Sequence, residues 1–187
     1  MGGSMSDVAN GAGRTRTPTV MLAATLPAAI FLVLASAKAH DAVAKRLMTI
    51  ASAVGVLPRS VGRDKWLIIA ETGAATAKLR QSLAAGLGAE ASFLDQSDSR
   101  TVIVADGPDV REMLAKGIGM DLAPDSFPEG ASAMTAFGHL TVQVTRTAAN
   151  RYDLIVTSSF ADSLWESLRE ASLEFGCDAP EKLTDLG

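Results

Sequence analysis

Apolar residues recur along the chain with two different periods, and each period predicts one kind of element. Between residues 39 and 54 an apolar residue returns every three or four positions, which predicts a helix with one buried face. Between residues 140 and 145 apolar and polar residues alternate, which predicts a strand with one buried face. Residues 29–35 form a short, almost wholly apolar run, which is typical of a strand buried on both faces.

These patterns, together with turn and cap signals, divide the chain into strands and helices. Strands are expected at residues 29–35, 66–70, 91–94, 101–105, 140–145 and 152–156. Helices are expected at residues 39–54, 72–86, 106–117 and 159–176. Thr72 and Asp106 occupy N-cap positions, and Ser159 with Asp162 resembles a capping box. The inward face of the last helix is expected to consist of Phe160, Leu164 and Leu168.

The order of these elements favours an α+β fold over an all-parallel arrangement. Residues 140–145 and 152–156 form an expected hairpin, and a hairpin joins antiparallel strands. We therefore expect antiparallel sheets with helices on one face, divided into two halves of ferredoxin-like size. The globular part is expected to be one domain over residues 19–176, between a flexible leader at 1–18 and a polar tail at 177–187.

Residues 20–37 allow a second interpretation. The run is apolar, Arg14 and Arg16 precede it, and residues 35–37 (Ala-Ser-Ala) are similar to a cleavage site, as in a secretory signal peptide. A membrane span is a further alternative, because about 20 apolar residues cross a bilayer. We favour a buried strand, since Pro27 fits the start of a strand and interrupts a helix. The chain is thus expected to be cytoplasmic and to have no membrane partner.

Composition narrows the classes of function. Of the 187 residues, 48% are hydrophobic and 20% are charged, a balance typical of a folded globular protein. The net charge of −4 leaves no broadly basic surface for a phosphate backbone, so no nucleic-acid partner is expected. The single cysteine excludes an intrachain disulfide and a multi-cysteine metal site.

Few residues are candidates for catalysis. His40, beside Asp41 at a helix start, is expected to be solvated, with a role as catalytic base as the alternative. His139 is expected to be structural or to lie in an interface. Cys177 follows a helix, and a helix C-terminus does not lower the pKa of a thiol. We therefore expect a binding or accessory component, and we assign no catalytic, cofactor-binding or metal-binding residue to this chain.

Residues 114–130 carry the most specific motif of the sequence. This segment resembles a loop that follows a helix in the gamma subunit of heterotetrameric sarcosine oxidase. Five positions agree with the pattern of that loop, namely Lys116, Asp121, Leu122, Pro124 and Phe127. The cysteine, proline and histidine of the family are replaced by Ile118, Gly119 and Ala123.

Other segments extend the resemblance to the region from about residue 29 to residue 176. The more specific ones are residues 95–104, Gly107-Pro108-Asp109, Gly138-His139, Arg146-Thr147 and residues 158–165. The turn and strand at residues 62–68 match more weakly.

The resemblance implies the fold of the folate-binding domain of glycine-cleavage aminomethyltransferase. It also implies an accessory gamma subunit, assembled with alpha, beta and delta subunits into a complex that oxidatively demethylates sarcosine to glycine, with one-carbon transfer to tetrahydrofolate. In that family FAD, FMN, NAD and zinc belong to the other subunits. The three replaced positions leave a related N-methyl amine dehydrogenase, acting for example on N-methylglutamate, as an alternative.

Five residues in or near these motifs are candidates for contact with other subunits, namely Lys116, Met120, Asp121, Phe127 and Trp165. A permanent interface between subunits is expected to be largely apolar. A self-sufficient folate-binding domain, which requires a preformed pocket, is the alternative from another class of function. An exported or membrane-tethered protein is the third hypothesis, because of residues 20–37.

Overall fold

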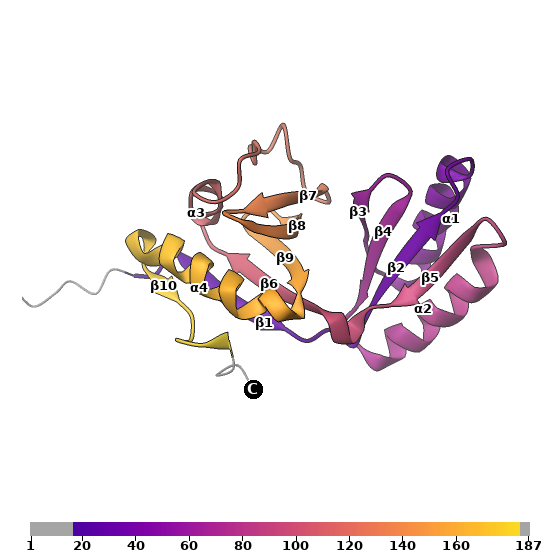
Figure 1. Cartoon of the computed structure of the whole chain (residues 1–187), viewed down its shortest axis with the longest axis horizontal. Coiled ribbons are helices and arrows are strands. Elements are labelled where there is room, and N and C mark those ends of the chain that lie inside the picture. Colours follow the sequence, from indigo (N-terminus) through magenta and orange to yellow (C-terminus); the bar gives the residue numbers. More distant parts are fainter. Residues whose placement is uncertain (1–16, 184–187) are drawn as a thin grey trace, which may run out of the picture.

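The structure, a computed structural model, describes residues 17–183. In this part of the chain ten strands form two sheets, called sheet A and sheet B here, which occupy the two sides of the molecule in Figure 1. Residues 1–16 of the expected leader and residues 184–187 of the expected tail lie outside the described residues. The division into one domain over residues 19–176 stays a prediction.

Sheet A has the strand order β10-β1-β6-β9-β8-β7. Its strands are β1 (Val20–Thr25), β6 (Arg100–Asp106), β7 (Ser132–Phe137), β8 (Leu140–Ala148), β9 (Arg151–Thr157) and β10 (Cys177–Asp178). The short β10, at the start of the expected polar tail, pairs with β1 in parallel, and the other neighbours pair antiparallel.

Sheet B has the strand order β3-β4-β2-β5, and its neighbours pair antiparallel. Its strands are β2 (Ala29–Ala35), β3 (Pro58–Gly62), β4 (Lys65–Ala70) and β5 (Ala91–Asp95). The α-helices are α1 (His40–Val54), α2 (Gly73–Gly86), α3 (Val110–Ala115) and α4 (Ala161–Ser172). Short 3₁₀ helices are η1 (Ser97–Ser99), η2 (Ser158–Phe160) and η3 (Leu173–Phe175).

Each sheet and its helices form one ferredoxin-like half. The chain runs through β2-α1-β3-β4-α2-β5 in the first half, which is the βαββαβ order of that motif. The second half follows as β6-α3-β7-β8-β9-α4, and β1 lies antiparallel beside β6 as β5 lies beside β2. The N-terminal strand therefore completes the second half, and the whole first half is inserted between β1 and β6.

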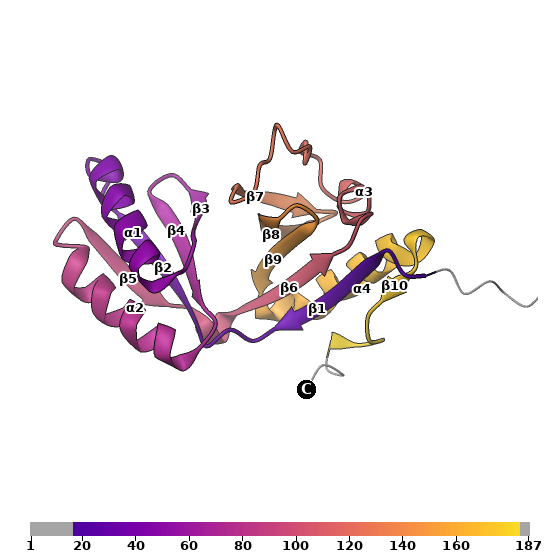
Figure 2. The ribbon, with the colours of Figure 1, turned by 180° about the vertical axis from the view of Figure 1, so that it is seen from behind.

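Helices cover one face of each sheet, with α1 and α2 on sheet B and α4 along sheet A (Figures 1 and 2). Helix α1 buries Val43 and Leu47 of the predicted stripe and ends at Gly55, whose φ of 78° is left-handed. Helix α4 buries Leu164 and Leu168 against sheet A. The antiparallel α+β fold predicted from the sequence is thereby confirmed.

The helix-free faces of the two sheets face each other. An apolar cluster joins them, and its buried members are Ile30, Leu67, Ile69, Val102 and Ile155. Beside it, Nη2 of Arg59 on β3 donates a hydrogen bond to Oδ2 of Asp153 on β9 at 2.6 Å. The hydroxyl of Ser132 on β7 donates to the carbonyl oxygen of Ser60 on β3 at 3.1 Å, where the two strands lie side by side (Figure 1). The sheets are therefore joined by apolar packing, an ion pair and a hydrogen bond.

Two predicted helix starts are wrong. Asp106 is the last residue of β6, because the strand stays paired with both β1 and β9 at this position, and α3 begins only after Asp109. Gly107 turns the chain between them with a φ of 129°, and an added Cβ would lie 2.2 Å from the carbonyl oxygen of Thr19. Ser159 lies in η2 and caps no helix, since α4 begins at Ala161.

The apolar run that also fits a signal peptide forms β1 and β2 of the two sheets. The strand expected at residues 29–35 is confirmed, whereas a separate strand at residues 20–25 was not predicted. Within residues 17–183, no helix has both the length and the apolar character needed to cross a membrane.

Candidate functional site

The motif segment at residues 116–130 forms a loop that covers one end of sheet A, and Arg146 holds it in place. This buried side chain on β8 donates from Nη1 to the carbonyl oxygen of Phe127 at 3.1 Å and from Nη2 to that of Ala149 at 2.7 Å. Its guanidinium carbon lies 5.9 Å from the centroid of the Tyr152 ring. Because one buried cation bonds to two separate stretches of backbone, the loop is a fixed part of the fold.

Phe127 and Trp165, two of the predicted interface residues, pack the core instead. Their exposed fractions are 3% and 1%, and both belong to the cluster between sheet A and its helices. Ile118 and Leu122 of the loop belong to the same cluster. The prediction of surface contact is therefore corrected for these two aromatic residues, whose side chains supply packing within this chain.

Lys116 lies at the surface but is bound to neighbouring residues of its own chain. Its Nζ donates to the carbonyl oxygen of Ala171 at 2.7 Å and pairs with a carboxylate oxygen of Glu174 at 2.7 Å. The same atom lies 4.7 Å from the centroid of the Phe175 ring. Lys116 therefore ties the end of α3 to the end of α4, and its assignment to a subunit interface stays a prediction.

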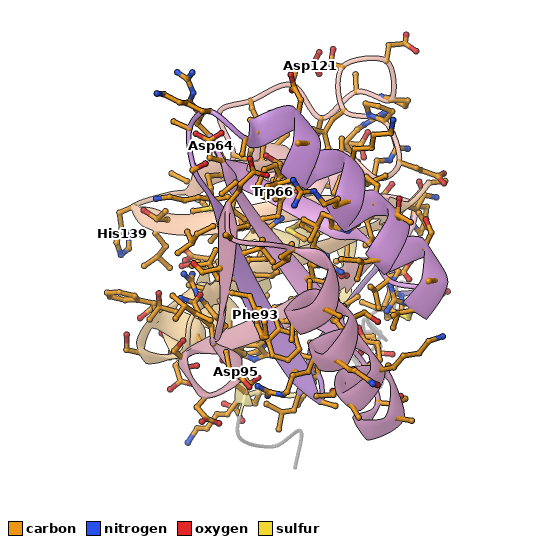
Figure 3. All side chains as sticks on the ribbon, turned by 90° about the vertical axis from the view of Figure 1, so that its right-hand side faces the viewer. Asp64, Trp66, Phe93, Asp95, Asp121 and His139 are labelled. Carbon is orange, nitrogen blue, oxygen red and sulfur yellow. The ribbon has the colours of Figure 1, made fainter. Side chains whose placement is uncertain are left out.

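Met120 and Asp121 complete the set of predicted interface residues. Met120 is half-buried and packs against the core cluster, whereas Asp121 is exposed at the loop (Figure 3). The carboxylate of Asp121 accepts a hydrogen bond from the Ser126 hydroxyl at 2.6 Å and another from the backbone N–H of Ala123 at 2.9 Å. These two donors, the hydroxyl first, hold the pKa of Asp121 below its ordinary value of 3.8.

A pH dependence of the stability follows from this lowered pKa. The contribution of ionised Asp121 is fully present above about pH 4 and is lost as the pH falls through the lower pKa of the folded state. We expect Asp121→Asn to lower the Tm near neutral pH, and we expect the difference from the wild type to shrink as the pH falls below the ordinary pKa of 3.8 and through the lower pKa of the folded state. Calorimetry across this range tests it, with the exposed Asp125→Asn as control. A difference that stays constant with pH would contradict the assignment.

His40 forms a contact that the sequence did not predict. Its Nδ1 lies 2.8 Å from Oδ1 of Asp64 in the β3–β4 turn, and its ring centroid lies 5.1 Å from that of Trp66. Asp64 has a φ of 61° and Trp66 follows on β4. His40, the first residue of α1, thus connects the start of this helix to sheet B. In Figure 3 His139 lies well apart from Asp64 and Trp66.

Cys177, the single cysteine of the chain, lies half-buried on β10. Burial raises the pKa of its thiol above the ordinary value. Among residues 17–183 there is no group of three or more His, Cys, Asp or Glu side chains that could hold a metal ion.

A groove at the end of sheet A brings together residues that the sequence analysis did not place beside one another. It encloses about 490 Å³, and its lining includes Arg100, Met134, His139, Thr157, Phe160 and Ser163. We call it the sheet A groove. Met134 and Phe160 are 43% and 52% exposed, although Phe160 was expected on the inward face of the last helix. The difference arises because Phe160 lies in η2, one residue before α4 begins.

One signal in the sequence pointed to this groove. Arg100, Gly138-His139 and residues 158–163 belong to three separate segments of the family resemblance. The paired ends of β6 and β9 and the turn between β7 and β8 bring those segments to one place. No local pattern predicted that they would meet.

Comparisons with known proteins agree with the resemblance. A family model described as "Sarcosine oxidase, gamma subunit family" matches residues 23–174. A curated protein named "Sarcosine oxidase subunit gamma", from Corynebacterium sp. (strain U-96), is 29% identical over 116 residues. That alignment covers 62% of this chain and 55% of the relative, so it spans about half of the length of the relative.

Solved structures share the fold. The heterotetrameric sarcosine oxidase from Corynebacterium sp. U-96, in complex with pyrrole 2-carboxylate, contains a chain with a TM-score of 0.65 and 24% identity, covering 86% of this chain and 87% of that one. The glycine cleavage system aminomethyltransferase T from Bartonella henselae has a TM-score of 0.55 and 15% identity, covering 82% of this chain and 46% of that one. The expected likeness to the aminomethyltransferase fold is confirmed.

Proposed function

Because the chain belongs to the sarcosine oxidase gamma subunit family, we propose that it is the accessory gamma subunit of a heterotetrameric sarcosine oxidase. The observation that carries the proposal is the extent of the family match, which runs from β1 to η3 and so takes in all four α-helices and every strand of the two sheets except the short β10. In this proposal the partners are alpha, beta and delta subunits, and the assembled enzyme acts in the cytoplasm.

The proposed complex oxidatively demethylates sarcosine to glycine and passes the one-carbon unit to tetrahydrofolate. FAD, FMN, NAD and zinc are proposed to be held by the other subunits. The part of this chain in the proposed complex is to bind and orient partner chains.

Of the three replaced motif positions, Ile118 has a structural explanation, because its side chain is buried in the core. Gly119 is exposed and has open space around the position of a Cβ, and the carbonyl oxygen of Ala123 accepts backbone hydrogen bonds that any residue could accept. A related N-methyl amine dehydrogenase, acting for example on N-methylglutamate, therefore stays the alternative to sarcosine oxidation.

Co-expression tests the proposal. The tagged full-length chain would be produced together with the sarcosine oxidase subunits encoded in the same genome, and the purified material analysed by size-exclusion chromatography and mass spectrometry. We expect all four chains to elute together in equal amounts and the complex to oxidise sarcosine, whereas the chain alone oxidises none. If this chain elutes by itself while the other three assemble and act without it, the proposal is wrong.

A further inference from the structure

The sheet A groove has an unusual charge for this chain. Although the net charge is −4, no Asp or Glu is among its lining residues, and Arg100 lies half-buried in it. Nε of Arg100 donates to the side-chain oxygen of Gln96 at 3.3 Å, which is a neutral acceptor. Within residues 17–183, no carboxylate forms an ion pair with Arg100. The groove therefore presents a positive charge that the chain itself does not neutralise.

The other lining residues give the groove a mixed character. Met134 from β7 and Phe160 from η2 expose large apolar side chains, whereas His139, Thr157 and Ser163 add hydrogen-bonding groups. Aromatic residues, Met and Arg are the types enriched at the centres of protein interfaces. A ligand that fits all of these groups must carry both an anionic group and an apolar group.

The size of the groove indicates that it would hold a few anchoring side chains of a partner subunit, at the centre of a larger interface between the two proteins. A stable interface buries about 1,600 Å² in total, and a few buried side chains at its centre supply most of the binding energy. A hollow of about 490 Å³ can take two or three side chains of a partner. The rest of such an interface would extend over the exposed residues that surround the groove, beyond Met134 on β7 and Phe160 on η2.

We propose that the sheet A groove binds an acidic segment of a partner subunit, with a carboxylate on Arg100 and an adjacent apolar side chain between Met134 and Phe160. The inference rests on the proposed function, because it requires that the chain assembles with other subunits. Arg100 supplies charge and a paired donor geometry that suits a carboxylate. His139 stands at the same rim and adds a further hydrogen-bonding group.

The test measures assembly of the gamma chain with the purified complex of the remaining subunits. Arg100→Glu and Phe160→Ala alter the two halves of the groove separately, and we expect each to raise the Kd, roughly tenfold or more for the charge reversal. Arg63→Glu and Met48→Ala are the matched controls, since Arg63 lies in the β3–β4 turn and Met48 on α1, and both are exposed and do not line the groove. Circular dichroism and Tm values establish that each variant folds.

The dependence of the assembly Kd on ionic strength gives a second readout, which a loss of apolar packing alone would not change. We expect wild-type affinity to fall as the ionic strength rises, and Arg100→Gln to weaken binding and flatten this dependence. If the folded Arg100→Glu and Phe160→Ala variants assemble with wild-type affinity, the inference is overturned while the proposed function stands. If the wild-type chain never assembles, both are overturned.

The groove could instead bind a free small molecule that carries a carboxylate, and Tm values together with the Kd of assembly distinguish this alternative. Phenylacetate combines a carboxylate with an apolar ring and serves as the probe. If it raises the Tm of the wild-type chain but not that of Arg100→Glu, and assembly is unaffected by either groove variant, the groove is a small-molecule site and the proposal is overturned.

Discussion

Replacing Asp153 with alanine is expected to lower the free energy of unfolding by about 3–5 kcal/mol, the largest effect we predict for a single residue. Asp153 on β9 and Arg59 on β3 are 7% and 6% exposed, and their side chains meet at 2.6 Å between the two sheets. Nε and Nη1 of Arg59 have no hydrogen-bond partner within the described residues. The variant Asp153→Ala would therefore leave a buried cation without its counter-charge.

Urea denaturation of the full chain measures this loss. The control is the double variant Arg59→Met with Asp153→Leu, which removes both charges and keeps apolar volume between the sheets. We expect it to recover most of the lost stability, because replacing both members of a buried pair by apolar residues is often neutral. A loss below about 1 kcal/mol for Asp153→Ala would show that the pair is solvated in solution.

Replacing Arg146 with methionine is expected to cost about 3 kcal/mol and to free the 116–130 loop. The guanidinium of Arg146 donates to the carbonyl oxygens of Phe127 and Ala149, and hydrogen bonds from a charged donor contribute about 1.5–3 kcal/mol each. Methionine fills similar apolar space but donates nothing, so the carbonyl oxygen of Phe127 would lose its buried cationic donor.

Hydrogen exchange separates release of the loop from a general loss of stability. In Arg146→Met we expect amides of the loop to exchange faster than those of β8 and β9 at equal conditions. The matched control is Arg151→Met, since the Arg151 side chain is 47% exposed and its contact with Asp106 is long, at 3.5 Å. If both variants show the same exchange in the loop, Arg146 does not hold it.

The regular elements with strong periodicity were predictable. The apolar spacing between residues 39 and 54 predicts α1, and alternation predicts β8 and its hairpin partner β9. By contrast β3 and β7 were not predicted, because Ser60, Gly62, Ser132 and Thr135 interrupt the apolar pattern that marks a strand. Those strands form by pairing with β4 and β8, and their pairing depends on neighbours rather than on their own composition.

The predicted interface residues include two, Phe127 and Trp165, that the structure places in the core. Phe127 and Trp165 match the family pattern, and a motif does not state whether a large apolar side chain points inward or outward. Burial in the core cluster answers that question for both residues. Phe160 is the opposite case, since a shift of the helix start by two residues moved it from the expected inward stripe to the surface.

The sequence by itself determined the fold class, the family and most of the helices and strands, because periodicity and local motifs depend on residues that are close along the chain. Three features were decided by the tertiary structure alone. They are the pairing of β1 with β6 of the second half, the ion pair between Arg59 and Asp153, which are 94 residues apart in the sequence, and the assembly of the sheet A groove from three segments. Each of these depends on how two sheets pack, and packing brings together residues whose separation in sequence carries no periodic signal.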